Sequence, residues 1–66
     1  MFRVTVVDDD YSFEYITKEV SYYYSWNGFD KRFIVGGINE SVFNQNHEFN
    51  GDFIEDLTHF KNVLGI

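Results

Sequence analysis

The chain has no cysteine, few basic residues and no long apolar run. The absence of cysteine excludes disulfide bridges and thiolate-bound metal. No stretch approaches the roughly 20 apolar residues that a membrane-spanning helix needs. A signal peptide is not expected either, because Arg3 is followed by only four residues before Asp8. These shortages predict a cytoplasmic protein that makes no contact with a membrane.

Lysine and arginine are scarce, at 5 residues against 11 aspartates and glutamates, and the formal net charge is −6. In so short a chain, this excess of negative charge argues against direct binding of nucleic acid or of anionic membranes. A basic partner protein is the complementary expectation. The alternative is that the charge only keeps an aromatic-rich small protein in solution.

Aromatic residues are abundant, with eight phenylalanines, five tyrosines and one tryptophan among 66 residues. A single domain over residues 1–66 is expected, and a domain of this size buries only about 60% of the surface that its unfolded chain exposes. Its core is small, and its aromatic surface is larger than one helix can cover. We therefore expect a homodimer.

The segment from Val20 to Val35 is predicted to form a β-hairpin with Asn27-Gly28 at its tip. Asparagine followed by glycine between two β-rich runs is the strongest short-range signal for a two-residue type I′ turn. Such a turn sets the register. It pairs Trp26 with Phe29, Tyr24 with Lys31, Tyr22 with Phe33 and Val20 with Val35. These residues share one face of the hairpin, which we expect to form the floor of the core.

Two more strands are predicted before the hairpin. In Phe2–Val7, the side chains of Phe2, Val4 and Val6 alternate with those of the other three residues, and most of the run is β-branched. The run Asp8–Asp10 ends this strand as a turn. The run Tyr11–Glu19 is ambiguous. Phe13, Tyr15 and Thr17 recur at every second position, which is typical of a strand, whereas Phe13, Ile16 and Val20 recur at helical spacing. The strand is favoured. This strand would pair with the first one and bend into the hairpin at a bulge near Lys18-Glu19.

The C-terminal segment is predicted to be a helix. Asp52 with Glu55 three positions later forms an N-terminal capping pattern, and Gly65 is a typical helix stop. Between them, apolar residues recur at three- and four-residue steps, at Phe53, Leu57, Phe60 and Leu64. The segment Ile38–Gly51 is expected to be a loop with a short edge strand around Ser41–Asn44. The predicted fold class is α+β, a three- or four-stranded antiparallel sheet with one C-terminal α-helix packed on one face.

No group of residues predicts catalysis, a cofactor or a metal ion. The carboxylates of Asp8–Asp10 do not follow a calcium-binding loop, which needs glycine at its sixth position, where this chain has Phe13. His47 and His59 fit no two-histidine metal spacing, and no serine has a histidine near it in the sequence. Glu55 and His59 are four residues apart, which predicts a contact on the exposed side of the helix. We expect a protein that is not an enzyme.

In its size, acidity, lack of cysteine and aromatic density, the chain resembles the small phage-encoded inhibitors that disable a host protein, in particular the DNA mimics. Such mimics occupy the DNA-binding surface of a basic target, for example a histone-like nucleoid protein or a DNA-repair enzyme. The resemblance implies an inhibitor that binds a basic DNA-binding protein in the cytoplasm of a host cell, because such surfaces neutralise a dense row of negative charge. The competing hypothesis is a generic protein-interaction or self-assembly module.

The predicted partner-binding residues are carboxylates and two aromatic anchors. The carboxylates lie in and after the first turn and at the exposed start of the helix, and they are Asp8, Asp9, Asp10, Glu14, Glu55 and Asp56. Tyr11 and Tyr23 are the expected anchors, because they flank acidic or polar positions rather than the predicted core face. A continuous negative stripe on the surface would favour DNA mimicry, whereas dispersal of the acids among lysine and arginine would favour the generic module.

Overall fold

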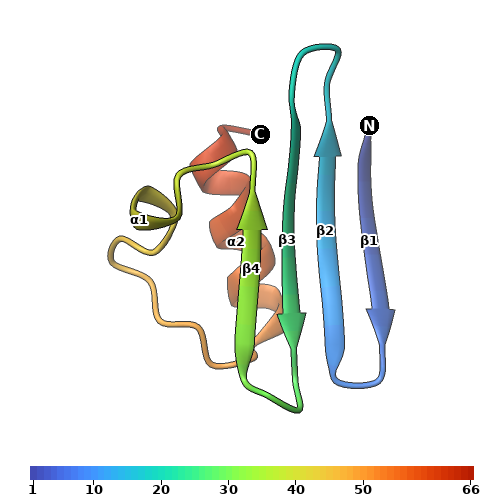
Figure 1. The fold of residues 1–66 in the computed structure, drawn as a ribbon, viewed down its shortest axis with the longest axis vertical. Helices are drawn as coiled ribbons and strands as arrows, with labels where there is room; N and C mark the ends of the chain where they lie inside the picture. Colours follow the sequence, from blue (N-terminus) through green and yellow to red (C-terminus); the bar gives the residue numbers. More distant parts are fainter.

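The computed structural model describes residues 1–66 as a four-stranded antiparallel sheet with a C-terminal helix on one face (Figure 1). The strands follow one another in the order β1-β2-β3-β4, and their bounds are β1 Phe2–Val7, β2 Asp10–Ile16, β3 Ser21–Asn27 and β4 Arg32–Gly36. The helices are α1 Glu40–Phe43 and α2 Phe53–Leu64. The predicted α+β class is therefore confirmed, with four strands. Neither helix has the length and hydropathy needed to cross a membrane.

The ambiguous run after the first turn forms a strand, as its alternation predicts. β2 pairs with β1 in a continuous antiparallel register that sets Phe13 opposite Val4. The predicted bulge near Lys18-Glu19 is wrong, because a tight turn connects β2 to β3 there. The amide of Thr17 donates to the carbonyl of Val20 at 3.0 Å, and the Thr17 hydroxyl donates to the same carbonyl at 2.8 Å. One threonine thus closes the turn with both its backbone and its side chain.

The hairpin formed by β3 and β4 has the predicted faces but a different register. Trp26 lies opposite Phe33 and Tyr24 opposite Val35, so the connecting loop has four residues instead of two. The side chain of Asn27 accepts hydrogen bonds from the next loop amides, and the left-handed residue is Lys31, with φ 57°. The two-residue turn would have placed the charged Lys31 side chain opposite Tyr24 on the core face. The longer loop moves this lysine out of the sheet.

The segment between β4 and α2 contains a short helix where an edge strand was expected. Asn39 caps α1, because its side-chain oxygen accepts a hydrogen bond from the amide of Ser41 at 2.9 Å. The helix places the ring of Phe43 in the core with no exposed surface, while its neighbour Val42 stays exposed. Phe43, with the half-buried Ile38 and Phe49 packed against the same core, therefore orders a segment that has little apolar periodicity of its own.

The core is a layer of aromatic rings between the sheet and α2, which crosses behind β3 and β4 in Figure 1. α2 begins at its cap Asp52, whose side chain accepts the amide of Glu55 at 3.1 Å, and it ends at Gly65, as predicted. Phe60 is fully buried, with its ring centroid 5.7 Å from that of Phe13. Phe13 stacks in turn on Tyr24 at 5.4 Å. The helix and the sheet thus share one aromatic core.

Candidate functional site

Two turns and the start of α2 meet at one end of the sheet, at the bottom of Figure 1. We call this region the acidic end and define it by Asp8, Asp9, Asp10, Asp30 and Asp52. The carboxylate of Asp10 accepts a hydrogen bond from the amide of Gly28 at 2.8 Å, which ties the β1–β2 turn to the β3–β4 loop. A Cβ on residue 28 would lie 2.5 Å from the Cβ of Asp9, so only glycine allows this contact. The backbones of the two turns and the carboxylate of Asp10 are therefore held in place, whereas the carboxylates of Asp8 and Asp9 have no hydrogen-bond partner.

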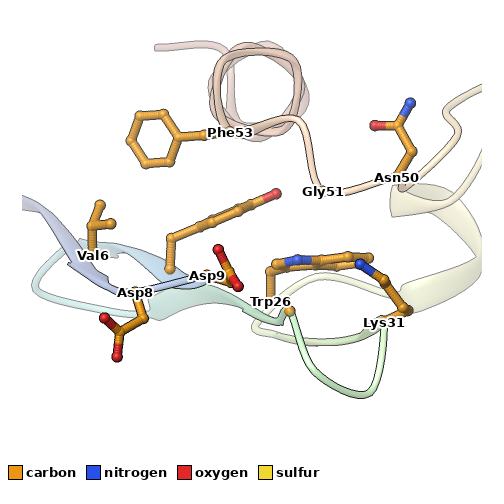
Figure 2. Close-up of a pocket in the computed structure, with 10 residues that line it drawn as sticks. Val6, Asp8, Asp9, Trp26, Lys31, Asn50, Gly51 and Phe53 are labelled. Carbon is orange, nitrogen blue, oxygen red and sulfur yellow. The ribbon is translucent and has the colours of Figure 1, made fainter.

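A hollow of about 370 Å³ opens between this pair of turns and the start of α2 (Figure 2). Asp8 and Asp9 lie on one side of it, and Phe53 and Gly51 lie on the helix side. The ring of Trp26, which is only 3% exposed, also lines the hollow. The hollow thus combines an apolar floor with a rim that carries the carboxylates of Asp8 and Asp9 and the ammonium group of Lys31.

The carboxylates of the acidic end form no ion pair with the rest of the chain. Arg3 forms an ion pair with Glu14, and the other contact between a basic and an acidic side chain joins His47 to the buried Asp56. Asp8, Asp9 and Asp10 are all exposed. The loop of Asp30 also carries Lys31 and the adjoining Arg32, so the acids predominate at this end but do not form the continuous negative stripe that would favour DNA mimicry. Negative charge is therefore available there for a partner.

Glu14 and Tyr23 lie away from the acidic end. They are cross-strand partners on the face of the sheet that the helix does not cover. Glu14 accepts a hydrogen bond from the Nε of Arg3 at 2.9 Å, and this pairing offsets its charge. Tyr23 is 43% exposed and its ring lies over Gly36, where a Cβ would come within 2.0 Å of the ring. The structure thus separates this pair from the turn carboxylates.

The expectation that Asp56 lies on the surface is wrong. Its side chain is 1% exposed, and it accepts hydrogen bonds through one oxygen from the hydroxyls of Tyr11 at 2.5 Å and Tyr24 at 2.8 Å. Its other oxygen lies 2.9 Å from the Nε2 of His47. Buried carboxylates need such partners, because an unpaired charge is costly to remove from water. Asp56 is the centre of a polar network inside the core, whereas its neighbour Glu55 is exposed as predicted.

Tyr11 is buried as well, so its expected role as an exposed anchor is wrong. Its side chain is 6% exposed and contacts Trp26 and Phe53 in the core. Burial raises the pKa of Tyr11 and of Tyr24 well above the ordinary tyrosine value, and the adjacent Asp56 carboxylate raises both further. Both hydroxyls therefore remain protonated donors.

The two histidines stack on each other, which the sequence does not indicate. The rings of His47 and His59 are nearly parallel, at an angle of 2°, and their centroids are 4.0 Å apart. The Nε2 of His59 donates to the carbonyl of Phe43 at 2.6 Å, so His59 holds α1 against α2 rather than extending into solvent beside Glu55. Two parallel rings cannot direct lone pairs at one ion, since the lone pairs lie in the ring planes. This geometry favours a packing role over metal binding.

Every buried polar side-chain atom has a hydrogen-bond partner. In particular, both tyrosine hydroxyls of the network are committed to Asp56. The network is a polar core that fixes the position of α2, and the exposed carboxylates of the acidic end take no part in it. Comparison with protein-family models found no matching family, and comparisons with curated proteins and with solved structures found no match.

Proposed function

We propose that the chain is a small protein-binding inhibitor whose acidic end occupies the DNA-binding surface of a basic host protein. The observation that carries this proposal is the set of exposed carboxylates without ion-pair partners on two turns that are tied together by the Asp10–Gly28 hydrogen bond. The carboxylate of Asp10, which the Gly28 amide holds in place, loses little freedom when lysine or arginine of a partner pairs with it. The field of the exposed carboxylates also accelerates the encounter with a basic surface.

Phe29 supports the proposal as an aromatic anchor. It was expected to pair with Trp26 in the core, but the longer loop leaves its side chain 93% exposed, next to Asp30. Aromatic residues are enriched among the few contacts that dominate binding energy. An anchor beside the carboxylates supplies the specificity that charge alone lacks, and it replaces the buried Tyr11 in this role.

The test is capture of partners from a bacterial lysate by the immobilised chain at low and high salt, followed by displacement with duplex DNA. The proposal predicts a captured DNA-binding protein, weaker capture at high salt, and release by DNA because both ligands occupy the same surface. A captured protein that DNA does not release would exclude mimicry and leave the generic interaction module.

Two matched variants locate the surface. The triple variant Asp8→Asn, Asp9→Asn, Asp10→Asn keeps side-chain oxygens that can still accept the Gly28 amide, and it raises the net charge from −6 to −3. The control Glu19→Gln, Glu40→Gln, Glu48→Gln makes the same change in charge at exposed positions outside the acidic end. We expect at least a tenfold loss of affinity at low salt in the first variant, on the order of 1.4 kcal/mol. Equal losses in both variants would show that only net charge matters.

A further inference from the structure

The two edges of the sheet differ in how they are covered. α1 and the connection to α2 lie beside β4, whereas no segment of the chain lies beside β1 (Figure 1). An open edge strand presents a row of backbone groups that can pair with another chain. β1 is therefore an unused pairing surface of six residues.

The backbone groups that face outward from β1 follow from its pairing with β2. The amide of Ile16 donates to the carbonyl of Met1, and the N-terminal ammonium group of Met1 donates to the carbonyl of Ile16, both at 2.8 Å. Antiparallel ladders alternate, so the residues bonded to β2 are the odd-numbered ones. The amides and carbonyls of Phe2, Val4 and Val6 consequently point to the free edge.

The side chains of this edge are apolar and lack the usual protection. Val4 is 38% exposed and Val6 is 57% exposed on the helix side of the sheet, next to the half-buried ring of Phe2. Protected edges carry proline, a bulge or an unpaired charge. β1 has neither proline nor a bulge, and its one charged side chain, Arg3, is bonded to Glu14 on the other face.

We propose that two copies of the chain pair through their β1 edges, antiparallel, around a twofold axis at Val4. This register sets Val4 opposite Val4 of the second copy and Phe2 opposite Val6, and the two four-stranded sheets become one sheet. The apolar side chains of the two edges then form a continuous row on the helix side. Identical strands pair in this way because a twofold interface uses the same surface on both copies.

Charge excludes one neighbouring register, and the backbone conformation of Asp8 excludes the other. An axis at Arg3 would put the two arginines directly opposite each other, which is unfavourable in a sheet. An axis at Thr5 would put Phe2 opposite Asp8, whose φ of 55° already takes it out of the strand. The axis at Val4 sets Arg3 opposite Thr5 and leaves no like charges face to face.

The experiment is sedimentation equilibrium of the chain over a range of concentrations, with charge-swap variants at the axis. The parent is expected to move from 7.9 kDa towards twice that mass as concentration rises. Val4→Lys and Val4→Glu should each stay monomeric, because each places like charges at the axis, and a 1:1 mixture of the two should form the dimer. Only an axis at residue 4 sets this residue opposite itself.

Ile34→Lys is the matched control, because Ile34 is 61% exposed on β4, at the opposite edge of the sheet, and this variant should still dimerise. Circular dichroism confirms that each variant is folded. Salt separates this interface from the acidic end, because screening weakens repulsion between two chains of charge −6 while it weakens attraction to a basic partner. A parent chain that remains monomeric at every concentration, or folded variants whose mixture stays monomeric, would overturn the proposed interface.

Discussion

The carboxylate of Asp56 and the carboxylates of the turn Asp8–Asp10 lie in opposite surroundings. Asp56 is 1% exposed and accepts hydrogen bonds from two tyrosines, with His47 against its second oxygen. The turn carboxylates face solvent, and only Asp10 accepts a hydrogen bond, from the Gly28 amide. The same side chain therefore serves stability in one place and is free for recognition in the other.

The position of Asp56 on α2 explains why this carboxylate is buried. Asp56 comes three residues after Phe53 and four before Phe60, so it lies on the same side of the helix as both of these core residues. Glu55, one residue earlier, is turned by about 100° and is exposed. An acidic residue inside an apolar stripe thus predicts a buried network, whereas an acidic run in a turn predicts a solvated surface.

Among the proposed variants, replacement of Asp56 is expected to cause the largest loss of unfolding free energy. Asp56→Ala leaves the buried hydroxyls of Tyr11 and Tyr24 and the ring nitrogen of His47 without their shared acceptor, and each buried donor left unsatisfied costs about 1 to 3 kcal/mol of unfolding free energy. In a domain of 66 residues, this approaches the whole stability. Urea unfolding followed by circular dichroism measures the loss.

Glu55→Ala is the control for Asp56, because the two residues are adjacent on α2 and Glu55 is exposed. It removes a first-turn carboxylate but no buried partner, so its cost should stay well below that of Asp56→Ala. Equal losses in the two variants would mean that the network adds nothing beyond the favourable charge at the helix start.

Removing one donor of the network is expected to have an intermediate effect. Tyr24→Phe leaves the ring in the core and deletes only the hydroxyl that donates to Asp56 at 2.8 Å. A hydrogen bond to a charged group contributes about 1.5 to 3 kcal/mol. Thermal unfolding measures the change, and Tyr23→Phe on the open face is the control that should be nearly neutral.

The same network predicts how stability depends on alkaline pH. The pKa of Tyr11 and the pKa of Tyr24 are both raised in the folded chain, by burial and by the Asp56 carboxylate. Their contribution is complete below the unfolded-state pKa of about 10 and is lost as the pH rises above it, because the unfolded chain releases protons that the folded chain retains. Urea midpoints measured from pH 8 to 11 should fall above about pH 10, and less steeply in Tyr24→Phe. A midpoint that is flat to pH 11 would contradict the buried network.

Local patterns in the sequence predict most of the sheet and all of α2. Period-two alternation marks the faces of the strands, and the cap Asp52 and the stop Gly65 set the ends of the helix. The same alternation places Tyr11 with Phe13 on the core face, so the burial of Tyr11 was accessible from its spacing. The acidic residues Asp8–Asp10, which precede Tyr11 in the turn, instead suggested that its side chain is exposed.

Local sequence patterns do not predict the register of the β3–β4 hairpin or the packing between distant segments. Asn27-Gly28 is compatible with a two-residue turn, and the choice of a four-residue loop depends on keeping Lys31 out of the core. α1 depends on a single buried residue, Phe43, and the pairing of His47 with His59 joins two segments that share no local pattern. Such contacts follow from tertiary packing, which no short window of sequence contains.

The smallest effect on stability is expected at the turn itself. The triple variant Asp8→Asn, Asp9→Asn, Asp10→Asn should change the unfolding free energy by no more than about 0.5 kcal/mol, as is usual for exposed positions. Asparagine tolerates the left-handed conformation of residue 8, with φ 55°, and its oxygen at position 10 can accept the Gly28 amide. Urea unfolding of the variant beside the parent measures the difference. A loss near that of Asp56→Ala would show that the turn carboxylates are part of the folded framework, and it would remove the separation between stability and recognition on which the proposed acidic binding surface depends.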